Sequence, residues 1–147
     1  MDSTQVFHVN TTNLEFSSEI FDETISCLAL RSNASGVSHV LWITTRNFLT
    51  LLLFQLACAT AQGFAVLTGD SRITYLSKPI SPEKAPFTRF NDGGCDSEGR
   101  FFAGTIYNEE RGIPGQLYRY DPSTMIAEVV DEGPLTASRL IQFLHYS

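Results

Sequence analysis

The sequence predicts an all-β fold, and three observations lead to this prediction. Most of the chain consists of short segments in which apolar and polar residues alternate, or in which β-branched and aromatic residues dominate. Gly, Pro, Asp, Asn and Ser bound these segments, as is typical of β-turns. Outside 40–61, no segment has a sustained helical period.

The expected strands follow one another along the chain. The first two form a hairpin, because 5–10 alternates apolar and polar residues, turn residues occupy 11–13, and the alternation resumes at 14–16. The other candidates are rich in β-branched or aromatic residues and end at turn residues; they cover 25–30, 63–67, 72–76, 101–106, 116–120 and 125–130.

The first hairpin is echoed later in the chain. Gln5–Asn10, three turn residues and Leu14 match Gln116–Asp121, three turn residues and Met125. A third hairpin lies between them, at 64–75. Hairpins that recur at intervals of a few tens of residues suggest stacked sheets or propeller blades. A β-sandwich also contains hairpins and is the alternative.

Composition and charge indicate a single globular domain and argue against a nucleic-acid partner. The chain has 43% apolar and 18% charged residues over 147 residues, which indicates one globular domain. Its net charge is −6, and Lys and Arg form no cluster, so we expect no nucleic-acid partner. Three cysteines stand far apart in sequence, and no basic and apolar leader is visible at the start. These features predict a reducing, cytoplasmic location.

One segment does not fit the pattern of strands. The apolar run 48–61 has 14 residues, fewer than the ~20 that span a bilayer, so we expect a buried helix or strand and no membrane partner. We interpret 37–55 as a translated intron, since Val37-Ser38 can be encoded by GTGAGT and Phe54-Gln55 by TTTCAG. A genuine insertion between blades is the alternative.

Polar residues are densest in 88–100, and two interpretations are open. Asn91 to Gly93 and Asp96 to Gly99 are typical turn residues, which would place two turns around a short strand. Alternatively, Arg89 and Asn91 lie two apart on an extended segment and share one face. A guanidinium and a carboxamide on one face could bind a carboxylate or a polyhydroxylated ligand.

The same region carries a family resemblance. The run Arg89-Phe-Asn-Asp-Gly93, then Asp96-x-x-Gly-Arg100-Phe-Phe-Ala-Gly-Thr105, then Gly115-x-Leu-Tyr-Arg119, resembles the senescence marker protein / gluconolactonase / regucalcin-like family. The resemblance implies a partial six-bladed β-propeller of two to three blades, covering 5–36 and 57–138. In this interpretation 1–147 is a single incomplete propeller domain, 37–55 is an insertion foreign to the family, and 139–147 is a tail foreign to it.

The resemblance also implies a function and its residues. The family hydrolyses sugar lactones with a divalent metal, calcium or zinc. Arg89 and Asn91 fall on its substrate-binding Arg-x-Asn, and Glu109 falls on a glutamate that contacts substrate in some members, with Glu110 as the near alternative.

The family's three metal ligands and its catalytic base have no counterparts in this chain by the same alignment. We therefore expect no metal site, no catalytic residue and an inactive fragment of a sugar lactonase. The alternatives are a non-catalytic carbohydrate- or partner-binding fragment and a membrane-associated protein built on 40–61. We also expect the isolated chain to be oligomeric or prone to aggregation, because an incomplete propeller exposes strand edges.

Overall fold

The computed structural model describes residues 4–9, 13–32, 54–68 and 71–133, and all regular secondary structure in these residues is β-strand. The all-β prediction is therefore confirmed. The strands are β1 (Thr4–Val9), β2 (Phe16–Phe21), β3 (Ile25–Ser32), β4 (Phe54–Thr60), β5 (Phe64–Thr68), β6 (Arg72–Ser77), β7 (Phe90–Cys95), β8 (Phe101–Thr105), β9 (Gln116–Asp121) and β10 (Ile126–Glu132).

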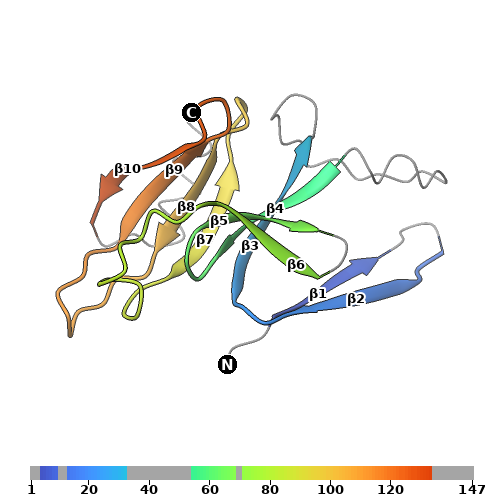
Figure 1. The fold of residues 1–147 in the computed structure, drawn as a ribbon, viewed down its shortest axis with the longest axis horizontal. Coiled ribbons are helices and arrows are strands. Elements are labelled where there is room, and N and C mark those ends of the chain that lie inside the picture. Colours follow the sequence, from blue (N-terminus) through green and yellow to red (C-terminus); the bar gives the residue numbers. More distant parts are fainter. Residues whose placement is uncertain (1–3, 10–12, 33–53, 69–70, 134–147) are drawn as a thin grey trace.

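The strands form three antiparallel sheets, each built from consecutive strands (Figure 1). The hairpin β1–β2 stands alone, β3 to β6 form a four-stranded meander, and β7 to β10 form a second one. A four-stranded meander is the unit of a propeller blade. The described residues thus make two complete blades and the half blade β1–β2, which confirms the expected two to three blades of a partial propeller.

The internal repeat is visible in the backbone. Each of the hairpins β1–β2, β5–β6 and β9–β10 has one non-glycine residue with positive φ shortly before its second strand. These residues are Leu14 at 59°, Ser71 at 58° and Met125 at 60°. The sequence comparison had matched Leu14 with Met125, and both adopt the left-handed conformation that is rare for such side chains. The three hairpins are therefore copies of one structural unit.

The blades pack face to face through two apolar layers. Between the two complete blades, the ring of Phe64 lies 5.1 Å from that of Phe90, 5.4 Å from Phe101 and 5.7 Å from Tyr120, between centroids. Aromatic rings at these distances attract one another in addition to excluding water. On the other face of the first blade, a second cluster joins the half blade to it; its buried members are Val6, Phe21, Cys58, Ala65 and Leu67.

The inner strands β3 and β7 lie against each other where the two blades meet. A side-chain Cβ at Gly93 would stand 2.8 Å from Sγ of Cys27 on β3 and 2.5 Å from the carbonyl oxygen of Phe102 on β8. Both distances are too short for any real Cβ, so a glycine is required for the strands to approach this closely.

The structure corrects one of the two interpretations of 88–100. Asn91, Asp92 and Gly93 belong to strand β7 and do not form a turn: Asp92 and Gly93 pair with β8, Asn91 is the extra residue of a β-bulge, and β7 packs against β3. The second predicted turn is confirmed. The carboxylate of Asp96 accepts hydrogen bonds from the backbone N–H groups of Glu98 and Arg100, and Gly99 has a φ of 79°.

Most of the unusual segment falls outside the described residues. This holds for 37–53, while Phe54 and Gln55 are the first two residues of β4. The intron interpretation stays a prediction, and so does the foreign tail 139–147, which also lies outside. In the part of the chain that the structure describes, no helix is long and apolar enough to cross a membrane.

Replacing Gly93 by alanine should destabilise the fold, because the new methyl group must displace the Cys27 side chain and the backbone of β8. Overpacking of this kind costs about 1–3 kcal/mol. Urea unfolding followed by circular dichroism measures the loss. Ser97→Ala, at an exposed position of the β7–β8 turn, is the matched control and should unfold like the wild type. A Gly93→Ala midpoint equal to that of the control would contradict the close approach of β3 and β7.

The outer face of the half blade should promote self-association. Phe7, Phe16 and Ile20 share this face by the β1–β2 register and are 59%, 74% and 62% exposed. Contiguous exposed apolar side chains of this kind favour association. The Phe7→Ser, Ile20→Ser double variant should elute later than the wild type in size exclusion. Ile126→Ser, which removes an equally exposed isoleucine from β10, should not. A wild-type chain that elutes as a sharp monomer would refute the prediction.

Candidate functional site

Four connections gather at one end of the blades. The antiparallel order places 22–24, 61–63, 78–89 and 106–115 at this end, on the lower side of Figure 1. The β7–β8 and β9–β10 turns lie at the opposite end. The sequence-predicted residues Arg89, Asn91 and Glu109 all belong to the first group or to the strand that leaves it. We call this the Arg89 end.

Arg89 and Asn91 flank the first residue of the inner strand β7. Arg89 is half-buried, and its Nη1 donates a hydrogen bond to the carbonyl oxygen of Phe90 at 3.0 Å. Asn91 is exposed and sits in a β-bulge. Phe90 pairs with Thr105 and Asp92 pairs with the adjacent Gly104, so Asn91 between them has no partner on β8. A bulge re-aims the side chain it carries. The orientation of Asn91 therefore depends on the bulge and not on simple alternation.

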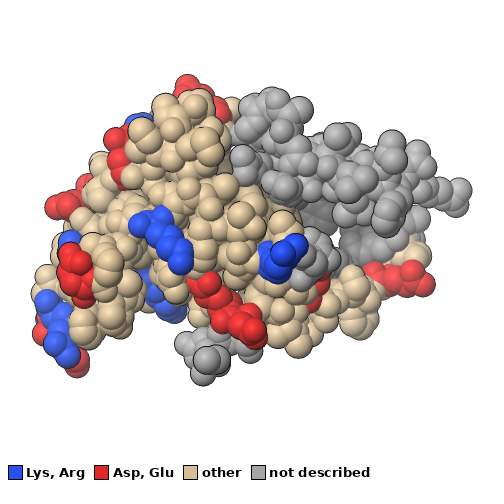
Figure 2. All heavy atoms as spheres, viewed as in Figure 1, with Lys and Arg blue, Asp and Glu red and all other residues tan. Residues whose placement is uncertain are grey.

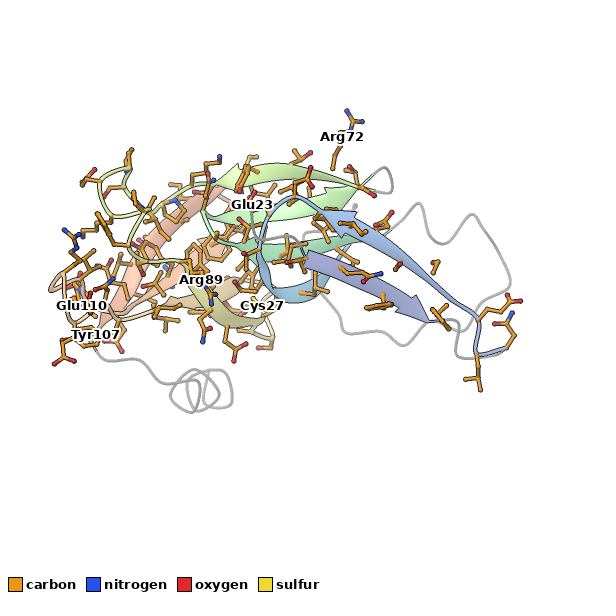
Figure 3. All side chains as sticks on the ribbon, turned by 90° about the horizontal axis from the view of Figure 1, so that it is seen from below. Glu23, Cys27, Arg72, Arg89, Tyr107 and Glu110 are labelled. Carbon is orange, nitrogen blue, oxygen red and sulfur yellow. The ribbon has the colours of Figure 1, made fainter. Side chains whose placement is uncertain are left out.

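Glu109 lies in a small hairpin loop between β8 and β9. Backbone hydrogen bonds of 3.0 Å in both directions join Asn108 to Ile113 and close the loop. Glu109 and Glu110 are both exposed at its tip, and Gly112, with a φ of 61°, completes the turn. Figure 3 shows the labelled Glu110 at the outer edge of the molecule, away from Arg89. The structure thus places Arg89 and Asn91 on either side of Phe90 and leaves Glu109 at the tip of a neighbouring loop.

The loop that carries Glu109 is fixed to the segment that carries Arg89. The Thr88 hydroxyl donates to the Ile106 carbonyl oxygen at 2.7 Å, and the Ile106 N–H donates to the Arg89 carbonyl oxygen at 3.0 Å. The Asn108 side chain donates to the Phe87 carbonyl oxygen at 2.9 Å. Finally, the Arg111 guanidinium lies 4.5 Å above the Phe87 ring, in a cation–π contact. The base of the loop therefore moves with β7.

A partly buried polar network at the same end was not predicted from the sequence. The Tyr75 hydroxyl donates to the Glu23 carboxylate and lies 3.0 Å from Thr60 Oγ1, while Nζ of Lys78 lies 3.8 Å above the Tyr75 ring. Burial, followed by the bond to Glu23, raises the pKa of Tyr75 above its usual range. The network ties connection 22–24 to β4 and β6. Glu23, Thr60 and Tyr75 lie on separate elements, so no local sequence motif predicts the network.

A comparison with protein-family models identifies the family of the chain. The model of the SMP-30/gluconolactonase/LRE-like region matches residues 6–138, which include Arg89, Asn91 and Glu109. This chain belongs to the SMP-30/gluconolactonase/LRE-like family. The family resemblance drawn from Arg89 to Arg119 is thereby confirmed. A comparison with curated proteins gives no match.

The family resemblance implies a divalent metal, but the described residues do not fit one. In the ranges 4–9, 13–32, 54–68 and 71–133, no three His, Cys, Asp or Glu side chains gather as metal ligands would. The acidic residues at the Arg89 end are engaged elsewhere or stand apart: Glu23 accepts from Tyr75, and Asp92 accepts from the N–H of Gly93 at 2.8 Å.

The two thiols near the blade contact should make stability fall at high pH. Burial is the main cause that raises the pKa of Cys27, and likewise of Cys58, from 9.0 to about 12. Between these values the unfolded chain has lost protons that the folded chain retains, so the free energy of unfolding decreases as pH rises from 9 to 12. Chemical unfolding at several pH values measures this slope. Cys27→Ala should have a shallower slope than the wild type, and an unchanged slope would contradict the prediction.

Proposed function

We propose that this chain binds a sugar lactone at the Arg89 end, with Arg89 and Asn91 as the groups that hold the ring. Family membership supports the substrate class. Within the described residues, the supporting observation is that both side chains occupy the start of an inner strand, where the bulge at Asn91 directs a carboxamide outward. The Arg89 guanidinium has five N–H donors and donates one hydrogen bond to the Phe90 carbonyl oxygen, so other donors can bind a ligand.

The chemistry of a lactone suits these two side chains. Its carbonyl and ring oxygens accept hydrogen bonds, which the guanidinium supplies with a positive charge. Its hydroxyl groups both donate and accept, as a carboxamide does. Glu109 and Glu110, at the tip of the adjoining loop, would accept from hydroxyl groups of a ligand that extends toward them.

We further propose that the activity of this pair is binding without turnover. Hydrolysis needs a group that activates water, either a base or a metal-bound hydroxide. A guanidinium has no acceptor and a carboxamide is not a base, so neither side chain can take a proton from water. The runner-up is a carbohydrate-binding fragment that does not require the lactone carbonyl, and the choice of ligand in the experiment separates the two.

Removing the guanidinium should abolish most of the binding. We expect glucono-1,5-lactam, a ring analogue that resists hydrolysis, to bind the wild-type chain, and Arg89→Ala to weaken this roughly tenfold or more, as the loss of a charged hydrogen bond predicts. Titration followed by NMR measures the affinity. Arg72→Ala removes an arginine that projects from another part of the molecule (Figure 3) and should bind like the wild type.

Two outcomes would contradict the proposal. Equal affinity of Arg89→Ala and the wild type would exclude Arg89 as a ligand contact. Gluconolactone turnover above the buffer rate, stimulated by calcium or zinc and lost in Arg89→Ala, would show that the chain is a catalyst. Binding of 1,5-anhydroglucitol, which lacks the carbonyl, as tightly as the lactam would favour the runner-up.

A further inference from the structure

Ser26, on the inner strand of the first blade, reaches across to the second blade at the Arg89 end. Its Oγ donates a hydrogen bond to the carbonyl oxygen of Phe90 at 2.7 Å. The same oxygen accepts the bond from Nη1 of Arg89 at 3.0 Å. Two side chains from different blades therefore converge on one carbonyl group, directly between the two residues assigned to the ligand.

The strand geometry explains why this carbonyl is available. The Arg89 carbonyl accepts from Ile106 and so points toward β8. The Phe90 carbonyl instead accepts from Ser26 of β3 in the neighbouring blade. Within the described residues, β7 is an edge strand of its sheet and pairs only with β8. A carbonyl oxygen has two lone pairs, and Ser26 and Arg89 together fill them.

We propose that Ser26 is a positioning residue for Arg89. Its hydroxyl fixes the Phe90 carbonyl relative to β3, and this carbonyl in turn holds the guanidinium at the edge of the bulge that carries Asn91. The inference rests on the proposed function, since positioning matters only if Arg89 meets a ligand. Without the Ser26 hydroxyl, the Phe90 carbonyl still accepts the hydrogen bond from Arg89 but no longer has a hydrogen bond to the neighbouring blade. The guanidinium then loses its fixed orientation.

The test uses four variants and the non-hydrolysable lactam. Ser26→Ala should weaken lactam binding roughly fivefold, the loss expected for one hydrogen bond. Ser26→Thr keeps the hydroxyl on a residue that suits a strand and should bind within about twofold of the wild type. In the Arg89→Ala background, adding Ser26→Ala should change nothing further, because the group that it positions is gone. Ser123→Ala removes a hydroxyl that donates to Asp121 at 2.6 Å, at the opposite end, and should bind normally.

A measurement without ligand separates this inference from the proposed function. The Nε–H NMR signal of Arg89, identified by its loss in Arg89→Ala, should shift in Ser26→Ala and stay in place in Ser26→Thr and Ser123→Ala. If the wild type binds no lactam but the signal shifts as described, the proposed function fails and the positioning contact stands. Three results would each overturn the role of Ser26. The first is an Arg89 signal that stays in place in Ser26→Ala, and the second is binding of the lactam by Ser26→Ala with wild-type affinity. The third is that Ser26→Ala weakens binding by the same factor in the Arg89→Ala background as in the wild type.

Discussion

The close approach of β3 to β7 is possible only because no side chain stands between them at Gly93. A methyl group there would meet both the Cys27 thiol and the backbone of β8. With the inner strands in contact, the aromatic rings around Phe64 can fill the space between the blades, where centroid distances are 5.1–5.7 Å. The thiol of Cys27 is then partly buried, and this loss of contact with water raises its pKa to about 12.

The same contact determines where the site forms. Ser26 near the start of β3 meets Phe90 at the start of β7, so both blades begin at the same end and their entry segments lie together. That end receives Arg89 from one connection and the loop of Glu109 from another. The hydrogen bonds from Thr88 and Asn108 make the two connections one unit. The packing of the blades thus places Arg89 beside the loop of Glu109, and the proposed binding role of Arg89 rests on this placement.

The sequence predicted the strands whose side chains alternate clearly, and it failed where burial on both sides or glycine hides the pattern. The three hairpins and the equivalence of Leu14 and Met125 were predicted because their turns are distinctive. The predicted strand 14–16 was misplaced, since β2 runs from Phe16 to Phe21 and Leu14 precedes it with a positive φ. In β7, Asn91 to Gly93 resembles a turn, and only contact with β3 and β8 makes it a strand. Arg89 and Asn91 were named from their spacing and from the family resemblance, and Glu109 from the resemblance alone. The bulge, the Glu23–Tyr75 network and Ser26 depend on contacts between distant elements, which no local pattern encodes.

Mapping the residues whose NMR signals respond to a bound ligand tests the central claim most directly. Glucono-1,5-lactam, added to the uniformly labelled wild-type chain, should shift signals in connections 22–24, 78–89 and 106–115 and at the start of β7, with the largest change at Arg89 and Asn91. The β7–β8 and β9–β10 turns, at the opposite end, should not respond. Shifts confined to those turns, or no response anywhere, would contradict the assignment of the Arg89 end as the ligand site.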